Sequence, residues 1–207
     1  MANSYRGRDM RVERVIAQYL DTHLYNDDIF TKHIRTDGRE AQLSGSDIII
    51  SIPSLGIDNA IVDEKAITHY MLKPLPTFAL ELSFLSQNGN VVEGWLTDAK
   101  KVTEYYLMMW IKATKSWNIE VTDITQIEYM LVKRNDILTW LNQQGFSVEQ
   151  LREKAQRIRE EQVSGAIDKI NGRDFWFYLT TKLAEQPINI VVRKKVYESL
   201  AVMKGII

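Results

Sequence analysis

The spacing of apolar residues along the chain marks out its expected elements. Apolar residues recur at steps of three and four between residues 10 and 25, which predicts an amphipathic helix with Asp9 as its N-cap. Shorter runs of alternating or continuous apolar residues follow, and these predict strands. The strands are expected at 46–52, 60–66, 77–84 and 91–96, with an Asn-Gly-Asn turn joining the last two as a hairpin.

The second half of the chain mixes both spacings. A helix capped by Asp98 is expected over 99–114, and the capping box of Ser147 and Gln150 opens another, with apolar residues as far as Ile170. The other expected elements are a strand at 124–133, a short helix stopped by Gly145, strands at 175–179 and 188–192, and a closing helix at 194–203. This order predicts an α/β or α+β domain around one central mixed sheet flanked by helices.

We expect one core with one extension. Residues 1–133 are predicted to form the core, and 134–207 a C-terminal extension of helices and a hairpin that packs on it without being an independent domain. The extension shows no converging acids, histidines or glycine loops. Its aromatic run, 175–177, is expected to pack on the core or to build an oligomer interface, as in a homodimer.

The composition is that of an ordinary globular protein, with 207 residues of which 45% are hydrophobic and 26% charged. The absence of cysteine excludes disulfides, thiolate zinc sites and cysteine nucleophiles. No apolar run approaches the length of a membrane span, and the N-terminal residues have no apolar signal segment. The expectation is therefore a cytoplasmic protein without a membrane partner.

The net charge of −1 argues against a histone-like, non-specific nucleic-acid binder. It does not argue against a nuclease, because acidic metal ligands offset a basic groove. Basic residues gather near both ends of the chain, at Arg6, Arg8, Arg11 and Arg14, and at Arg193, Lys194 and Lys195. Each cluster reads either as a solvated surface or as a contact for a nucleic-acid backbone.

The most informative polar residues lie in two consecutive apolar runs. Asp47 opens the first run, and Asp63-Glu64-Lys65 interrupts the second. Because strand side chains alternate between faces, Asp63 and Lys65 share a face and Glu64 points away. If the two strands are neighbours, Asp47 joins them. Two carboxylates can hold Mg²⁺ or Mn²⁺ through oxygen, and an adjacent ammonium can orient a water molecule for phosphodiester cleavage.

Each of these residues also has a purely structural interpretation. Asp47 could cap the turn at Gly45, and Asp63 with Lys65 could be a same-face surface ion pair, which is a weak interaction. Glu81 is either a third ligand or a partner for a lysine, and whether Lys100 or Lys101 joins the site is left open. The three histidines share no spacing that would indicate a metal site.

With an Asp at the start of one strand and Asp-x-Lys on the next, the chain resembles the PD-(D/E)XK nuclease superfamily over residues 9–133. That resemblance implies a restriction endonuclease-like core: a helix, a strand meander, a helix and a further strand. It makes Asp47 and Asp63 metal ligands and Lys65 the catalytic lysine, and it adds Glu13 from the first helix as a further ligand and catalytic residue. The chain also looks similar to uncharacterised bacterial and phage proteins of that superfamily.

Two departures from the pattern are visible. Ser46 stands where the superfamily name has proline, and no Gln-x-x-x-Tyr motif follows the strands. The leading hypothesis is a divalent-metal-dependent nuclease, for which the resemblance implies DNA as the substrate in preference to RNA. The alternative is a catalytically inert nucleic-acid-binding or protein-interaction module of phage or mobile-element type on the same fold.

Overall fold

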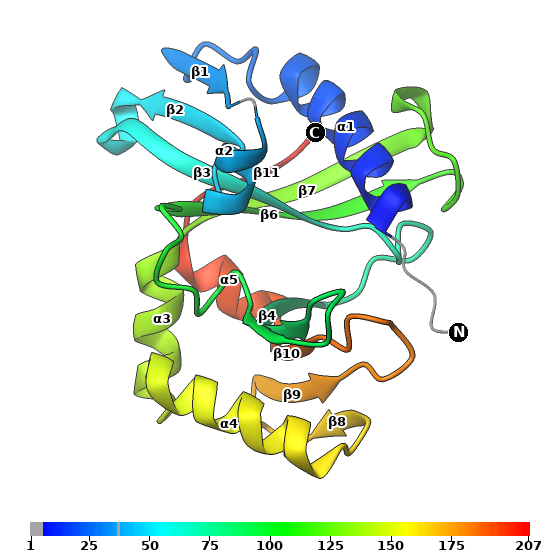
Figure 1. Cartoon of the computed structure of the whole chain (residues 1–207). Helices are drawn as coiled ribbons and strands as arrows, with labels where there is room; N and C mark the ends of the chain where they lie inside the picture. The colour runs from blue at the N-terminus through cyan, green and yellow to red at the C-terminus, as the bar shows by residue number, and fades with distance from the viewer. Residues whose placement is uncertain (1–5, 37) are drawn as a thin grey trace. The chain divides into compact units, whose positions relative to one another are not determined.

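A computed structural model describes residues 6–36 and 38–207 (Figure 1). The chain divides into two compact units. One, here the six-stranded unit, runs from the first helix to Leu75 and includes Lys101–Arg134 and Leu200–Ile207. The other, the five-stranded unit, consists of Pro76–Lys100 and Asn135–Ser199. This division differs from the expected boundary between 133 and 134, because 76–100 joins the later segment and the last residues join the earlier one.

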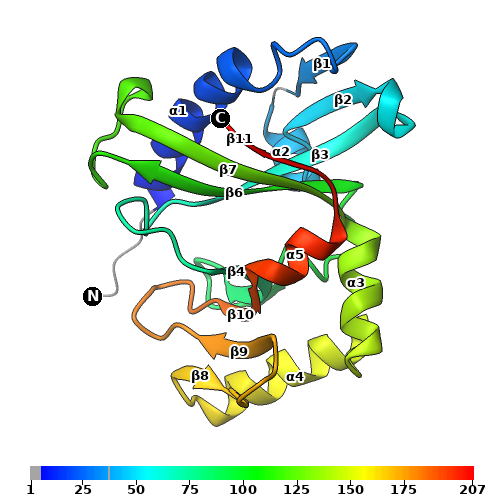
Figure 2. The same ribbon diagram turned by 180° about the vertical axis from the view of Figure 1, so that it is seen from behind.

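The six-stranded unit is built on a mixed sheet with the strand order β1-β2-β3-β6-β7-β11. The first three strands form an antiparallel meander, β3 and β6 are parallel, and the remaining pairs are antiparallel. Figure 2 shows β11 beside β7 at one edge of this sheet. The strands are β1 (Lys32–Arg35), β2 (Ile48–Ile52), β3 (Ile57–Ile67), β6 (Tyr105–Ala113), β7 (Ile124–Lys133) and β11 (Ala201–Ile206).

Helix α1 (Arg6–His23) confirms the first predicted helix, but it begins before Asp9, so the prediction of Asp9 as its N-cap is wrong. Its apolar stripe, which includes Val12, Ile16 and Leu20, is buried in one core with residues of β2, β3, β6 and β7. Burying such a stripe against a sheet is the main source of stability for a helix of this kind. The unit also contains α2 (Arg39–Ser44) and the 3₁₀ turns η1 (Pro53–Leu55) and η2 (Val121–Asp123).

The five-stranded unit has an antiparallel sheet with the order β5-β4-β10-β9-β8. On β9 every second residue is buried, and α4 places Leu151, Ala155 and Ile158 in the core. Ser147 and Gln150 form the predicted capping box at the start of α4. The elements are β4 (Thr77–Leu85), β5 (Val91–Glu93), α3 (Arg134–Gln143), α4 (Val148–Glu161), β8 (Gly165–Ile167), β9 (Phe175–Leu179), β10 (Ile188–Arg193) and α5 (Lys194–Leu200).

Three further predicted elements are wrong in type or length. The segment expected as a helix over 99–114 is strand β6, whose residues from Tyr105 to Ile111 are all buried. A strand buried on both faces reads as a continuous apolar run, which periodicity does not separate from a helix. Helix α4 ends at Glu161 because Gln162 adopts a left-handed conformation, and α5 ends at Leu200, where β11 begins.

The prediction of one central sheet is also wrong, because the structure has two sheets. Strand β4 pairs with β10 and not with the strands that carry Asp47 and Asp63. As a result, the connection from β3 to its parallel neighbour β6 contains β4 and β5, and residues 68–104 include no α-helix. The mixed α/β character is as expected, whereas the helix that a restriction endonuclease-like core has at this point is missing. Among the described residues, no helix is both long and apolar enough to cross a membrane.

Candidate active site

Asp47 lies immediately before β2 and extends the pairing of β2 with β3. Its backbone N–H donates to the Val62 carbonyl at 2.9 Å, and its Oδ2 accepts the Glu64 N–H at 2.7 Å. The backbone register of the two strands stops at Ile48 opposite Val62. The Asp47 carboxylate therefore satisfies a backbone donor of β3 beyond the point where its neighbouring strand ends. This contact alone gives Asp47 a structural role.

Asp63 and Lys65 lie on one face of β3, as the two-residue period of a strand requires. Lys65 Nζ and Asp63 Oδ1 are 2.6 Å apart, with 25% of the lysine side chain and 4% of the aspartate side chain exposed. Asp63 is therefore a buried carboxylate whose ammonium partner reaches solvent. Such a pair is costly to desolvate, which distinguishes it from the surface ion pair of the structural interpretation.

The two carboxyl groups interact directly. Burial, and then the negative charge of Asp63, raise the pKa of Asp47 to about 7, and a hydrogen bond between the two carboxyl groups acts in the same direction. The Lys65 ammonium and the Glu64 N–H oppose this rise. Burial lowers the pKa of Lys65, but Asp63 and Asp47 outweigh it and raise that pKa above its ordinary value. The structure thus brings Asp47, Asp63 and Lys65 to one spot.

Glu13 lies on α1, outside the two strands that carry Asp47, Asp63 and Lys65. Its side chain is exposed on α1, and its charge acts on Lys65, whose pKa it helps to raise. In the described part of the chain, no group of three or more histidines, aspartates and glutamates is placed to hold a metal ion. Glu13 therefore contributes to the electrostatics of Lys65, and its role as a metal ligand stays a prediction.

A tight backbone approach closes one side of the site. Thr103 Oγ1 donates to the Gly45 carbonyl at 2.6 Å, and the Val102 N–H donates to the Ser44 carbonyl at 2.9 Å. Gly45 has φ +76°, and a Cβ there would lie 3.4 Å from Asp63 Oδ2 and 3.2 Å from Lys101 Cδ. Lys101 and Thr103 thus border the site. The local sequence pattern does not signal this, beyond the glycine that precedes Asp47.

Two of the residues left open by the sequence lie outside the six-stranded unit. Lys100 and Glu81 belong to the five-stranded unit. Tyr106 pairs with Asp63 in the parallel β3–β6 register and is fully buried, as expected of a core residue. Burial raises the pKa of Tyr106 above its ordinary value although Arg134 opposes the shift, so its phenol stays neutral at physiological pH.

Glu64, between the two site residues, points to the opposite face of β3. Tyr25 Oη donates to Glu64 Oε1 at 2.7 Å, and Arg35 Nη1 lies 2.9 Å from Oε2. Arg35 also pairs with Asp21 of α1 at 2.8 Å. Glu64 thus points away from Asp63 and Lys65, as the two-residue period of a strand predicts. The network links β3 to α1 and restrains the strand that carries Asp63 and Lys65.

No family model matches the chain, and neither the curated proteins nor the solved structures include a significant match. The interpretation of the site therefore depends on its own geometry.

Replacing Gly45 with alanine is expected to destabilise the six-stranded unit at the site. The left-handed conformation costs a non-glycine residue about 1–2 kcal/mol. The new Cβ also collides with Thr103 Oγ1, which its hydrogen bond to the Gly45 carbonyl holds in place. Overpacking of this kind adds about 1–3 kcal/mol.

Urea unfolding of Gly45→Ala and Gly89→Ala measures the two terms. Gly89 has the same φ of +76° but nothing within 4 Å of its added Cβ, so its variant carries the conformational cost alone. The expectation is contradicted if the two variants lose equal stability.

Proposed function

We propose that the protein is a divalent-metal-dependent nuclease that hydrolyses phosphodiester bonds, DNA in preference to RNA. The observation that carries the proposal is the meeting of two carboxylates and one ammonium in a largely buried corner of the sheet. In the free protein Asp47 and Asp63 repel each other whenever both are ionised, which an ordinary structural ion pair would avoid. A cation bound by both oxygens would relieve this repulsion.

The donor set suits a hard cation, because it offers carboxylate oxygens and no histidine or thiolate. When bound, Mg²⁺ or Mn²⁺ would polarise the scissile phosphate and lower the pKa of a water molecule. Asp47 and Asp63 would hold the ion, and Glu64 N–H fixes the orientation of the Asp47 carboxylate. With Asp63 holding the ion, the Lys65 ammonium would be available to orient the attacking water or to stabilise the charge that develops on the phosphate.

An inert binding or interaction module on the same fold is the second candidate. The observation that favours it is the structural role of Asp47, whose carboxylate accepts the Glu64 N–H of β3 and needs no metal to do so. The missing helix between β3 and β6 points the same way, and so does the finding that the described residues contain no group of three acids or histidines placed to hold a metal ion.

Metal titration and cleavage assays test the proposal together. Mn²⁺ binding followed by electron paramagnetic resonance should show a site that Asp63→Asn removes. Labelled duplex, single-stranded and branched DNA, and RNA, should be tested with Mg²⁺, Mn²⁺ and EDTA. Metal-dependent cleavage of at least one DNA substrate is expected. If no substrate is cut and no metal binds, the nuclease proposal is wrong, and the inert binding or interaction module becomes the favoured function.

A further inference from the structure

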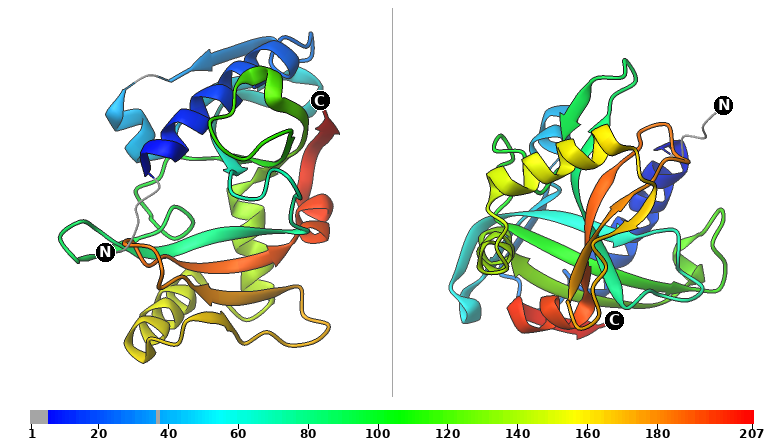
Figure 3. Two further views of the ribbon diagram at one scale, coloured as in Figure 1. Left: turned by 90° about the vertical axis from the view of Figure 1, so that its right-hand side faces the viewer. Right: turned by 90° about the horizontal axis from the view of Figure 1, so that it is seen from below.

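One face of the five-stranded sheet carries a row of accessible aromatic and charged side chains. On β9 the residues Phe175, Phe177 and Leu179 are buried, so Trp176 and Tyr178 share the opposite face. Trp176 is half-buried and Tyr178 is 39% exposed. The left view of Figure 3 shows β4, β10 and β9 side by side with α3 behind them. Phe175 contacts Trp140 of α3, so α3 packs on the face opposite the Trp176 row.

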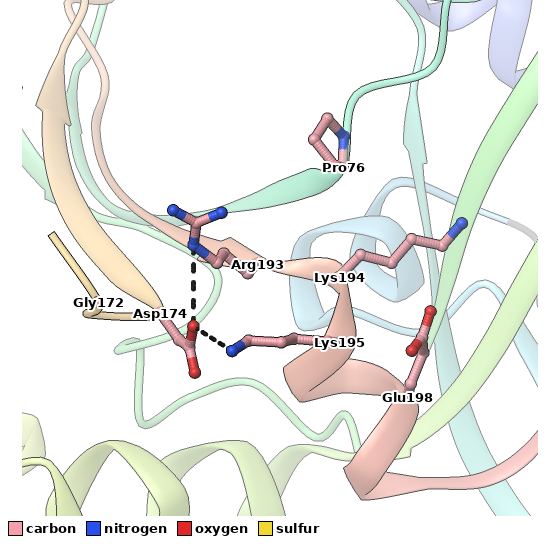
Figure 4. Close-up of a pocket in the computed structure, with 7 residues that line it drawn as sticks. All are labelled: Pro76, Gly172, Asp174, Arg193, Lys194, Lys195 and Glu198. Carbon is pink, nitrogen blue, oxygen red and sulfur yellow. Dashed lines mark ion pairs between the residues drawn. The ribbon is translucent and has the colours of Figure 1, made fainter.

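A positively charged corner lies at the end of this row. Arg193 Nε lies 3.7 Å, and Lys195 Nζ 2.7 Å, from the same oxygen, Asp174 Oδ1. Asp174 lies immediately before β9, two residues ahead of Trp176 and on the same side as Trp176. Figure 4 shows these residues in an open pocket of about 430 Å³, with the two terminal nitrogens of Arg193 directed away from Asp174. One carboxylate thus holds two cations close together and leaves a positive charge unbalanced.

Two backbone donors of the pocket residues are already paired. The Arg193 N–H donates to the Asp174 carbonyl at 2.8 Å, and the Lys194 N–H donates to the Pro76 carbonyl at 3.0 Å. Lys194 and Glu198 also line the pocket and carry opposite charges. An incoming anion would therefore be bound through the side chains of Arg193 and Lys195.

A third cation lies over the aromatic row itself. Lys169 Nζ is 4.8 Å from the centroid of the Trp176 ring. Together, Lys169, Arg193 and Lys195 outnumber Asp174 along one strip of the surface. Such a strip offers flat rings to bases and cations to phosphates, a combination found where proteins bind unpaired nucleic acid.

We propose that this face binds single-stranded nucleic acid, with two bases on Trp176 and Tyr178 and a phosphate at Arg193 and Lys195. Residues two apart on a strand are separated by about 6.6 Å, roughly twice the 3.4 Å base step of a duplex. An extended single strand can span both rings, whereas bases stacked in a duplex are too close together. Lys169 would move from the Trp176 ring to a neighbouring phosphate. The inference goes beyond the metal site and does not depend on it, because binding needs no metal.

Fluorescence anisotropy of a labelled oligothymidylate with the whole protein in EDTA tests this proposal. Cleavage is blocked there, so the result is independent of the nuclease activity. Binding is expected, and the matching duplex should bind at least about 10-fold more weakly. Trp176→Ala and Tyr178→Ala should each weaken binding about 5- to 100-fold, the range for loss of one base–aromatic stack. Arg193→Ala should make the salt dependence of the binding constant less steep, by the amount expected for about one phosphate contact.

Matched variants separate this site from general surface effects. Trp117, which is 58% exposed in the six-stranded unit, provides the aromatic control, and Trp117→Ala should bind like the unmodified protein. Trp176→Phe keeps a ring and should retain most of the affinity, while melting curves show whether each variant is folded. The proposal is overturned if the unmodified protein does not bind the single strand, if the duplex binds as well, or if Trp117→Ala weakens binding as much as Trp176→Ala.

Discussion

Asp63→Asn is expected to abolish metal-dependent cleavage while the chain stays folded. Asparagine keeps the size of the side chain and an oxygen that accepts from Lys65, but it removes the charge that would hold the cation. Loss of one preorganised electrostatic contact typically costs about 10²–10³ in rate, and loss of a metal ligand should cost at least as much. Stability should change by less than about 2 kcal/mol, because the lost ion pair is offset by relief of the repulsion from Asp47.

Initial cleavage rates at saturating Mg²⁺, with melting curves on the same samples, measure this effect. Glu64→Gln is the matched control, since Glu64 lies on the same strand but contacts Tyr25 and Arg35 on the opposite face. It should cleave at close to the unmodified rate at temperatures well below its melting point. Lys65→Ala should bind Mn²⁺ yet cleave at least about 10²-fold more slowly. Equal losses of cleavage rate in Asp63→Asn and Glu64→Gln would contradict the role of Asp63 as a metal ligand, because any disturbance of β3 would then have the same effect.

The positions of Asp47, Asp63 and Lys65 could be predicted because they depend on local rules. The two strands are consecutive and joined by a short turn, so they pair, and the two-residue period places Asp63 and Lys65 on one face. The neighbours of the site are different. Thr103 meets Gly45 across 58 positions of the chain, a contact set by tertiary packing and invisible to local periodicity.

The same distinction explains the error in the sheets. Alternation correctly indicates that 77–84 is a strand, but it does not identify the partner, and β10 lies more than a hundred residues later. The segment of β6 was wrongly predicted as a helix for another reason. It is central in the mixed sheet, so both of its faces are apolar and its alternation disappears. A sequence therefore predicts half-exposed strands and local turns better than buried central strands and distant pairings.

Asp47→Asn is expected to stabilise the metal-free protein at pH 8 and to remove any stabilisation by Mg²⁺. The amide oxygen can still accept the Glu64 N–H, and the amide nitrogen can donate to Asp63, so both contacts of the carboxylic acid are preserved. What disappears is the buried negative charge next to Asp63. The variant should therefore be more stable than the unmodified protein by about 1–4 kcal/mol at pH 8, according to the size of the pKa shift.

The pH dependence has a definite sign. Burial and Asp63 raise the pKa of Asp47 to about 7 in the folded protein, above the ordinary value of about 3.9 for an unfolded chain. The folded state then holds a proton that the unfolded state releases, so stability from this group is fully present below about pH 4 and is lost as the pH rises through 7. Lys65, with its raised pKa, stays charged throughout this window.

Urea unfolding in EDTA between pH 4.5 and 8 measures the difference between the unmodified protein and Asp47→Asn, which should grow as the pH rises. Asp28→Asn removes an exposed aspartate after α1 and should show no such growth. At about 100 times the dissociation constant, Mg²⁺ should add about 2.7 kcal/mol to the unmodified protein and nothing to Asp47→Asn, because ligand that binds only the folded state stabilises it by mass action. If Asp47→Asn is instead the less stable protein in EDTA at pH 8, the hydrogen bond from the Glu64 N–H to the Asp47 carboxylate outweighs the repulsion between Asp47 and Asp63. Asp47 is then a structural residue that extends the pairing of β2 with β3.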